Sequence, residues 1–128
     1  MRLLLDTHAF IWWDIEPSPL SPRAFELCQN PDNQLVLSVV SVWEMEIKIQ
    51  LGKLGFERPL DEMVAEQRRL NGVEILPVTL EHVFEIEKLP LIHRDPFDRL
   101  LIAQARVEIV PFISRDKEFS AYPVTVEW

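Results

Sequence analysis

The chain has 128 residues, with 13 Lys and Arg against 21 Asp and Glu, so its formal net charge at pH 7 is −8. That balance excludes the general basic surface with which many proteins bind nucleic acid or anionic membranes, so any such partner must be bound locally. The 48% share of hydrophobic residues and the presence of only 3 glycines argue against disorder and against a repeat array. We therefore expect one compact domain over residues 1–128.

The single cysteine and the short apolar start of the chain bear on its cellular compartment. Cys28 cannot form an internal disulfide or a cysteine-based metal cluster, which favours a reducing cytoplasm. The apolar run from Leu3 to Leu5 is closed by Asp6, which is too soon for a signal peptide, and no later run approaches membrane-spanning length. The expectation is a cytoplasmic protein with no membrane partner.

The first segments predict a strand followed by two helices. The run from Leu3 to Leu5 is typical of a buried parallel strand, with Asp6 at its carboxyl end. A short helix is expected from His8 to Trp13, and Ser21-Pro22 starts another that ends near Gln29. Ligands of open α/β sheets bind at the carboxyl ends of strands, so Asp6 is placed for function, although capping the following helix explains it equally well.

A second strand and helix carry the next acidic candidate. The β-branched run from Leu35 to Val40 predicts a buried strand, and Ser41 is then expected to cap a helix. Glu44 follows three residues later, which is the spacing of a capping box. Besides a functional role, Glu44 could complete that box or form an ion pair with Lys48 one helical turn away.

The remaining segments continue the alternation of helices with short apolar strands. Helices are expected at 59–70 and 79–88, and strands at 73–78, 110–113 and 124–126, the last of them at a sheet edge. Asp116 follows the strand at 110–113 as Asp6 follows the first strand. It therefore repeats the strand-end position of Asp6.

The segment from His93 to Ala105 predicts a helix start with two carboxylates. Pro96 suits the first helical position and Asp95 is a good N-cap, so Asp98 falls in the first turn. Apolar residues then cover most of the helix surface, which indicates deep burial. Taken alone, the two aspartates are explained by capping and by the helix dipole.

Together, these elements predict an α/β fold with a small, mostly parallel sheet flanked by helices in a three-layer, Rossmann-like arrangement. In such a fold, strand carboxyl ends and helix amino ends share one edge, and four carboxylates are expected there: Asp6, Glu44, Asp98 and Asp116. Crowded carboxylates repel and raise one another's pKa, and a hard cation such as Mg²⁺ or Mn²⁺ relieves that repulsion. A site of this kind suits phosphodiester hydrolysis.

The chain resembles the PIN-domain endoribonucleases, in particular the VapC-type toxins of prokaryotic toxin–antitoxin pairs. The resemblance spans nearly the whole chain and is carried by four segments: Leu3 to His8, Ser38 to Glu44, Asp95 to Ala105, and Ser114-Arg115-Asp116. It implies that Asp6, Glu44, Asp98 and Asp116 hold Mg²⁺ or Mn²⁺, with Asp95 left as the cap. Ser114 stands where such proteins more often have threonine, a change that keeps the hydroxyl.

The resemblance also implies an RNA substrate, a homodimer, and inhibition by a small antitoxin protein whose tail covers the acidic cleft. An alternative is a PIN-like module that has lost catalysis and serves in binding or regulation, because filled ligand positions do not prove turnover. A phosphotransfer enzyme built on Asp6 is less well supported, since the chain has no second aspartate two residues on and no glycine-rich phosphate loop.

Overall fold

A computed structural model describes residues 1–128 and contains a five-stranded sheet in which every neighbouring pair is parallel. The strand order is β3-β2-β1-β4-β5. The strands are β1 (Arg2–Leu5), β2 (Gln34–Ser38), β3 (Glu74–Leu76), β4 (Phe112–Ile113) and β5 (Val126–Glu127). The predicted α/β class and the edge position of the last strand are confirmed.

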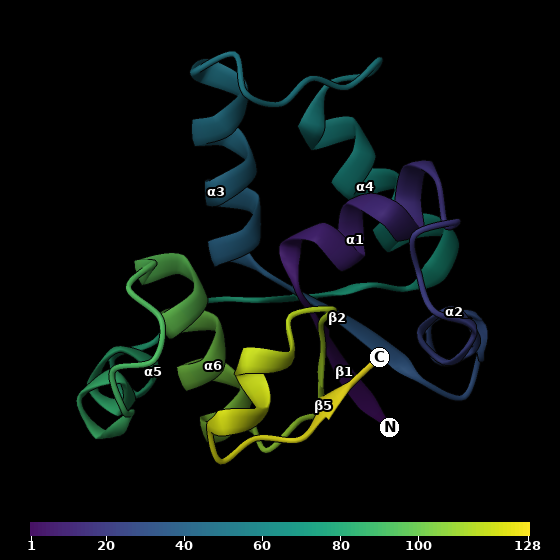
Figure 1. The fold of residues 1–128 in the computed structure, drawn as a ribbon. Coiled ribbons are helices and arrows are strands. Elements are labelled where there is room, and N and C mark those ends of the chain that lie inside the picture. The colour runs from purple at the N-terminus through teal and green to yellow at the C-terminus, as the bar shows by residue number, and fades with distance from the viewer.

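Helices cover both faces of this sheet (Figure 1). They are α1 (Thr7–Ile15), α2 (Pro22–Gln29), α3 (Val39–Gln50), α4 (Leu60–Asn71), α5 (Leu80–Glu85) and α6 (Pro96–Glu108), with short 3₁₀ helices η1 (Ile86–Lys88) and η2 (Lys117–Ala121). Helices α1, α2 and α4 lie on one side and α5 and α6 on the other (Figure 1). Each helix falls short of the length and apolar character that a membrane-spanning segment needs.

The alternation of side chains along β1 divides the core into two layers. Leu3 and Leu5 pack with Phe10 of α1 on one face, whereas Leu4 packs with Leu101 of α6 on the other. All five of these side chains are completely buried. Burying each one stabilises the fold by about 1.5–3 kcal/mol, so β1 is fixed from both sides and Asp6, which follows it, has a rigid support.

The start of α3 differs from the expectation. The strand β2 ends at Ser38, two residues before the predicted end, and Ser38, not Ser41, is the N-cap of α3. Its hydroxyl oxygen accepts a hydrogen bond from the backbone N–H of Val40 at 3.0 Å, and this contact turns the chain into the helix despite the β-branched Val39 and Val40. Ser41 is instead a fully buried residue of the first helical turn.

The last three strands, β3, β4 and β5, are also shorter than expected because of prolines and local turns. Pro77 directly follows β3 and Pro111 directly precedes β4, and neither has an N–H to donate to a neighbouring strand. The N–H of Val124 bonds the carbonyl of Tyr122 at 2.8 Å, so this residue closes a turn and β5 begins only at Val126.

The order of the strands creates a switch point between β1 and β4. From β1 the chain moves outward to β2 and β3, and it returns to the opposite side of β1 to form β4 and β5. The connections that leave β1 and β4 therefore separate at their carboxyl ends, which opens a crevice where ligands of open α/β sheets bind. Asp6 and Asp116 follow these two strands.

Candidate functional site

A pocket of about 420 Å³ lies at the carboxyl edge of the sheet. Ten residues line it: Asp6, His8, Trp12, Glu44, Lys48, Asp95, Asp98, Arg115, Asp116 and Phe119. The structure thus brings all four predicted carboxylates, together with Asp95, to the wall of one pocket.

Asp6 is placed by β1 and oriented by a serine of the strand beside it. Its Oδ2 accepts a hydrogen bond of 2.8 Å from the hydroxyl of Ser114, which directly follows β4. Asp6 occupies the N-cap position of α1, but its side chain makes no capping hydrogen bond, so capping does not explain this carboxylate. Burial raises the pKa of Asp6, and the bond from Ser114 opposes that rise only in part.

Glu44 lies on α3 and is only 6% exposed. The hydroxyl of Thr7 donates to its Oε1 at 2.7 Å, and Lys48 Nζ lies 2.9 Å from its Oε2. The ion pair with Lys48 is therefore confirmed, whereas the capping box with Ser41 is wrong. Ser41 Oγ lies 2.9 Å from Thr7 Oγ1, so Ser41 supports the hydroxyl that holds Glu44.

The two aspartates at the start of α6 differ in their hydrogen bonds. Asp95 Oδ1 accepts from the backbone N–H of Phe97 at 2.8 Å and of Asp98 at 3.4 Å, which confirms Asp95 as the N-cap. Asp98 forms no ion pair, and burial together with the negative charges of Asp95, Asp6 and Glu44 raises its pKa to about 7. The sequence predicts that crowding raises the pKa of at least one of the four carboxylates, and Asp98 shows the effect.

Asp116 follows β4 and caps η2. Its Oδ1 accepts from the backbone N–H of Glu118 at 2.9 Å, and its Oδ2 lies 3.0 Å from His93 Nε2. Burial raises the pKa of Asp116, but the bonds from His93 and from Glu118 N–H outweigh burial, so the pKa lies below its ordinary value. The pKa values of Asp116 and Asp98 are therefore shifted in opposite directions.

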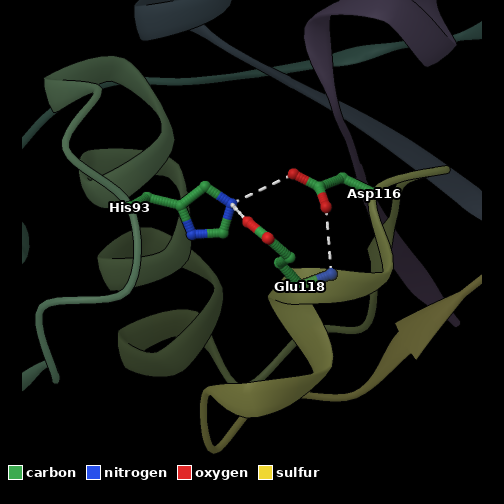
Figure 2. Close-up of side chains that lie close together, drawn as sticks. All are labelled: His93, Asp116 and Glu118. Atoms are coloured by element: carbon green, nitrogen blue, oxygen red, sulfur yellow. Dashed lines mark hydrogen bonds and ion pairs between the residues drawn. The ribbon is translucent and has the colours of Figure 1, made fainter.

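The four carboxylates border the pocket without forming a compact cluster. The one group of at least three His, Cys, Asp and Glu whose ligand atoms all lie within 4.8 Å of one another is His93, Asp116 and Glu118. In Figure 2 the His93 ring points from the loop before α6 toward the two carboxylates of the β4–η2 segment. Only Asp116 belongs both to this group and to the predicted set.

The sequence interpretation missed several polar residues that complete the site. Thr7 could have been noticed because it directly follows Asp6 at the strand end, and Lys48 was weighed only as a helix-surface partner of Glu44. His8 and Arg115 each flank a predicted ligand region, yet no spacing rule singles them out. His93 lies 23 residues from Asp116, and no local pattern connects the two.

Comparison of the chain with models of protein families identifies its family. A model of the PIN domain matches residues 3–124. The chain belongs to the PIN domain family. The match includes all four predicted carboxylates, which confirms the resemblance drawn from the sequence segments.

A ribonuclease and two VapBC structures are among the proteins to which this PIN domain protein is similar. It is 27% identical over 135 residues to Ribonuclease VapC22 of Mycobacterium tuberculosis, with 97% of each chain covered. Its fold is similar to that of VapBC2 from Rickettsia felis, solved bound to a promoter DNA fragment, with a TM-score of 0.73, 14% identity, and coverage of 99% and 98% of the two chains. It is also similar to VapBC-1 from nontypeable Haemophilus influenzae, with a TM-score of 0.66, 17% identity, and coverage of 99% and 97%.

Proposed function

We propose that this PIN domain protein is a divalent-metal-dependent endoribonuclease that acts as the toxin of a toxin–antitoxin pair. The observation that carries the proposal is the convergence of Asp6, Glu44, Asp98 and Asp116 on one pocket at the switch point of a parallel sheet. The similarity to Ribonuclease VapC22 over nearly the full length supports an RNA substrate.

The donor set of the pocket fits Mg²⁺ or Mn²⁺. Carboxylate oxygens are the hard ligands these ions prefer, and the raised pKa of Asp98 indicates negative charge that the protein itself does not balance. Asp6, Glu44, Asp98 and Asp116 would hold the ion. A bound divalent cation supplies Lewis acidity toward a phosphodiester and toward the attacking water.

The residues around these carboxylates fix their orientation. Ser114 holds one oxygen of Asp6, and Thr7 and Lys48 each hold one oxygen of Glu44. Asp98, at the amino end of α6, retains side-chain oxygens free of protein donors. Two carboxylates are thus held rigidly, while Asp98 is the one whose charge depends most on a bound cation.

Cationic and aromatic side chains on the pocket wall suit single-stranded RNA. Lys48 and Arg115 line the pocket and can contact phosphate oxygens, which supplies the local positive charge that an acidic protein needs. Trp12 lines the same pocket, and the guanidinium of Arg115 lies 6.0 Å from its ring centroid. Unstacked RNA bases stack on such rings, so this side of the pocket would bind a nucleotide next to the cleaved bond.

An antitoxin partner would use the same cleft. The acidic pocket is suited to an arginine or lysine side chain of the partner. Trp43, one residue before Glu44, is 57% exposed and packs edge-on against Phe97, with ring centroids 5.0 Å apart. A partner helix could place its apolar face on these rings. Titration with the product of an adjacent short reading frame should show binding that weakens as salt increases, whereas a dissociation constant independent of salt would contradict an electrostatic anchor.

A homodimer is supported by the exposed apolar face of α5. Leu80, Val83 and Phe84 share one side of this helix and are 72%, 44% and 66% exposed. Apolar side chains grouped in this way mark contact surfaces, here for a second copy of the chain. Sedimentation equilibrium should give a dimer mass that Phe84→Glu reduces to a monomer; a monomeric parent protein would contradict the proposal.

The nuclease proposal is tested by incubating the purified protein with single-stranded RNA in Mg²⁺, in Mn²⁺ and in chelator. We expect internal cleavage in either metal and none in chelator, with Asp98→Asn inactive in all three. RNA binding without cleavage in either metal would instead identify a catalytically inactive PIN-like binding module.

A further inference from the structure

His93 is a buried histidine that the proposed chemistry does not use. Its side chain is 8% exposed, and its ring stacks on Phe119 with centroids 4.4 Å apart and planes inclined by 13°. A second stacked contact, at 5.4 Å, is made with Tyr122. The ring therefore has one fixed plane, and its Nε2 is directed at Asp116 (Figure 2).

Hydrogen bonds on both sides of the ring hold His93, and the contact with Asp116 shows that Nε2 carries a proton. The Tyr122 hydroxyl accepts from the backbone N–H of His93 at 2.8 Å and lies 2.9 Å from Nδ1 of the same residue. Tyr122 thus holds both the backbone and the ring of His93. On the other side of the ring, Nε2 lies 3.0 Å from Asp116 Oδ2, and an ionised carboxylate can only accept, so Nε2 must carry the proton that it donates to Asp116.

We propose that His93 is a positioning residue, which donates from Nε2 to Asp116 and so fixes that carboxylate for the metal, with Tyr122 holding the ring in place. The inference rests on the proposed function, because it takes Asp116 to be a metal ligand. It assigns to the His93, Asp116 and Glu118 group an orienting role and excludes His93 itself as a ligand, since a protonated Nε2 has no lone pair to offer a cation.

The contacts of Asp116 show how this positioning works. The Glu118 N–H holds Oδ1 at 2.9 Å, and His93 holds Oδ2 at 3.0 Å, so both oxygens are fixed while each retains a lone pair. The backbone N–H of Asp116 bonds Ser114 Oγ at 3.1 Å, and the same hydroxyl donates to Asp6. Asp116 and Asp6 are thereby joined through Ser114, so a displaced Asp116 also disturbs Asp6.

The tautomer is tested directly in the metal-free parent protein. Long-range ¹H–¹⁵N correlation spectra of ¹⁵N-labelled protein report which ring nitrogen of each histidine is protonated. We expect His93 to be protonated at Nε2, in keeping with its contact with Asp116. A His93 protonated at Nδ1 with a free Nε2 would overturn the proposal and identify His93 as a metal ligand.

Mg²⁺ affinity, measured by calorimetry, tests the consequence for the site. Residues that orient metal ligands typically contribute about 10–100-fold to metal affinity or activity. We expect His93→Leu to weaken Mg²⁺ binding by at least about tenfold and His93→Gln, whose amide can still donate, to recover most of that loss. Equal affinity of His93→Leu and the parent, or no recovery in a folded His93→Gln, would contradict the positioning role.

His82 provides a matched control. It is 1% exposed and its Nε2 lies 3.0 Å from a carboxylate oxygen of Glu108, away from the pocket. We expect His82→Gln to leave Mg²⁺ affinity unchanged, and an equal loss in this variant would mean that His93→Leu acts only through general destabilisation. If His93→Leu does not fold, as shown by circular dichroism, Tyr122→Phe takes its place and should weaken Mg²⁺ binding several-fold.

The tautomer and the metal affinity do not depend on RNA turnover. A parent protein that cleaves no RNA would therefore refute the proposed ribonuclease while leaving the result for His93 intact. Conversely, an active ribonuclease with a His93 protonated at Nδ1 would refute the inference alone.

Discussion

The two ends of the sheet differ in how far their carboxylates are paired with cationic or hydrogen-bonding partners. At the amino end, Arg2 of β1 pairs with Glu74 at 2.5 Å and with Glu108 at 3.5 Å, and Glu108 also lies 3.0 Å from the buried His82. Hydrogen bonding from His82 is the main reason that the pKa of Glu108 lies below its ordinary value. Every carboxylate of this network has a cationic or hydrogen-bonding partner, so the network stabilises the fold.

At the carboxyl end, negative charge exceeds what the protein balances. Asp6 and Asp98 form no ion pair, and the pKa of each is raised, that of Asp98 to about 7. Helix α6 runs between the two ends, with Asp98 in its first turn and Glu108 as its last residue. Unpaired carboxylates with raised pKa values are typical of a functional site, whereas the paired ones at the other edge are typical of a structural network.

The largest expected effect is a loss of RNA cleavage when a carboxylate at the carboxyl end of the sheet is replaced. Asp98→Asn should lower the rate of Mg²⁺-dependent RNA cleavage by about 10²–10³-fold or more, because it removes a negative group placed for the cation. Asp95→Asn is the matched control three residues earlier, and it should retain much activity because asparagine also caps helices. An inactive Asp95→Asn beside an active Asp98→Asn would reverse the two roles.

A substitution in the ion-pair network at the amino end of the sheet should lower stability and leave RNA cleavage unchanged. Glu108→Gln should lower the free energy of unfolding by about 1 kcal/mol near neutral pH, since it weakens the bonds to His82 and Arg2 at a side chain that is 26% exposed. The folded pKa of Glu108 is lowered, so its contribution is present above the ordinary carboxyl pKa and is lost as pH falls through the folded pKa. Denaturant unfolding should show a difference near pH 7 that becomes smaller as the pH falls below the ordinary carboxyl pKa.

An effect of similar size and opposite sign is expected for Asp98→Asn without metal. The folded pKa of Asp98 is about 7, above its value of about 3.9 in an unfolded chain, so its charge destabilises the fold increasingly between these values and fully above them. Near pH 8 in chelator, Asp98→Asn should therefore unfold several degrees above the parent, a gain of about 1 kcal/mol. Near pH 4 the two should coincide, and a variant that melts below the parent at pH 8 would show that Asp98 is structural.

The smallest effect is expected at Ile109, which follows α6 at the amino end of the sheet. Ile109 has a φ of 54°, in the left-handed region that β-branched residues avoid, and it is 88% exposed. Glycine adopts this conformation freely, so Ile109→Gly should stabilise the fold by about 0.5–1 kcal/mol. Thermal unfolding should show the gain with no change in cleavage rate; a loss of stability would mean that the Ile109 side chain has a contact role.

The sequence predicted the elements that local chemistry determines. The five strands, the six helices, the Asp95-Pro96 start of α6 and the placement of Asp6 and Asp116 after strands all follow from apolar runs, caps and prolines. The N-cap of α3 was misplaced because Val39 and Val40 favour a strand locally, while a contact of the Ser38 hydroxyl with Gln104, 66 residues away, helps to place that serine at the turn.

The rest of the site depends on contacts between distant segments. Ser114 meets Asp6 across 108 residues and His93 meets Asp116 across 23, and neither pairing has a local sequence signal. The same holds for the pKa of Asp98, which results from burial and from charges on three different elements. Sequence patterns were sufficient to place the carboxylates at one edge of the sheet. Their hydrogen-bond and ion-pair partners could be identified only from the folded structure.

The most direct test of the account is a crystal of the protein soaked in Mn²⁺ and measured at a wavelength that reveals manganese by anomalous scattering. The account predicts a peak in the pocket, within ligand distance of at least two of Asp6, Glu44, Asp98 and Asp116. A map with no peak in this pocket at saturating Mn²⁺ would contradict the claim that these carboxylates form a metal site.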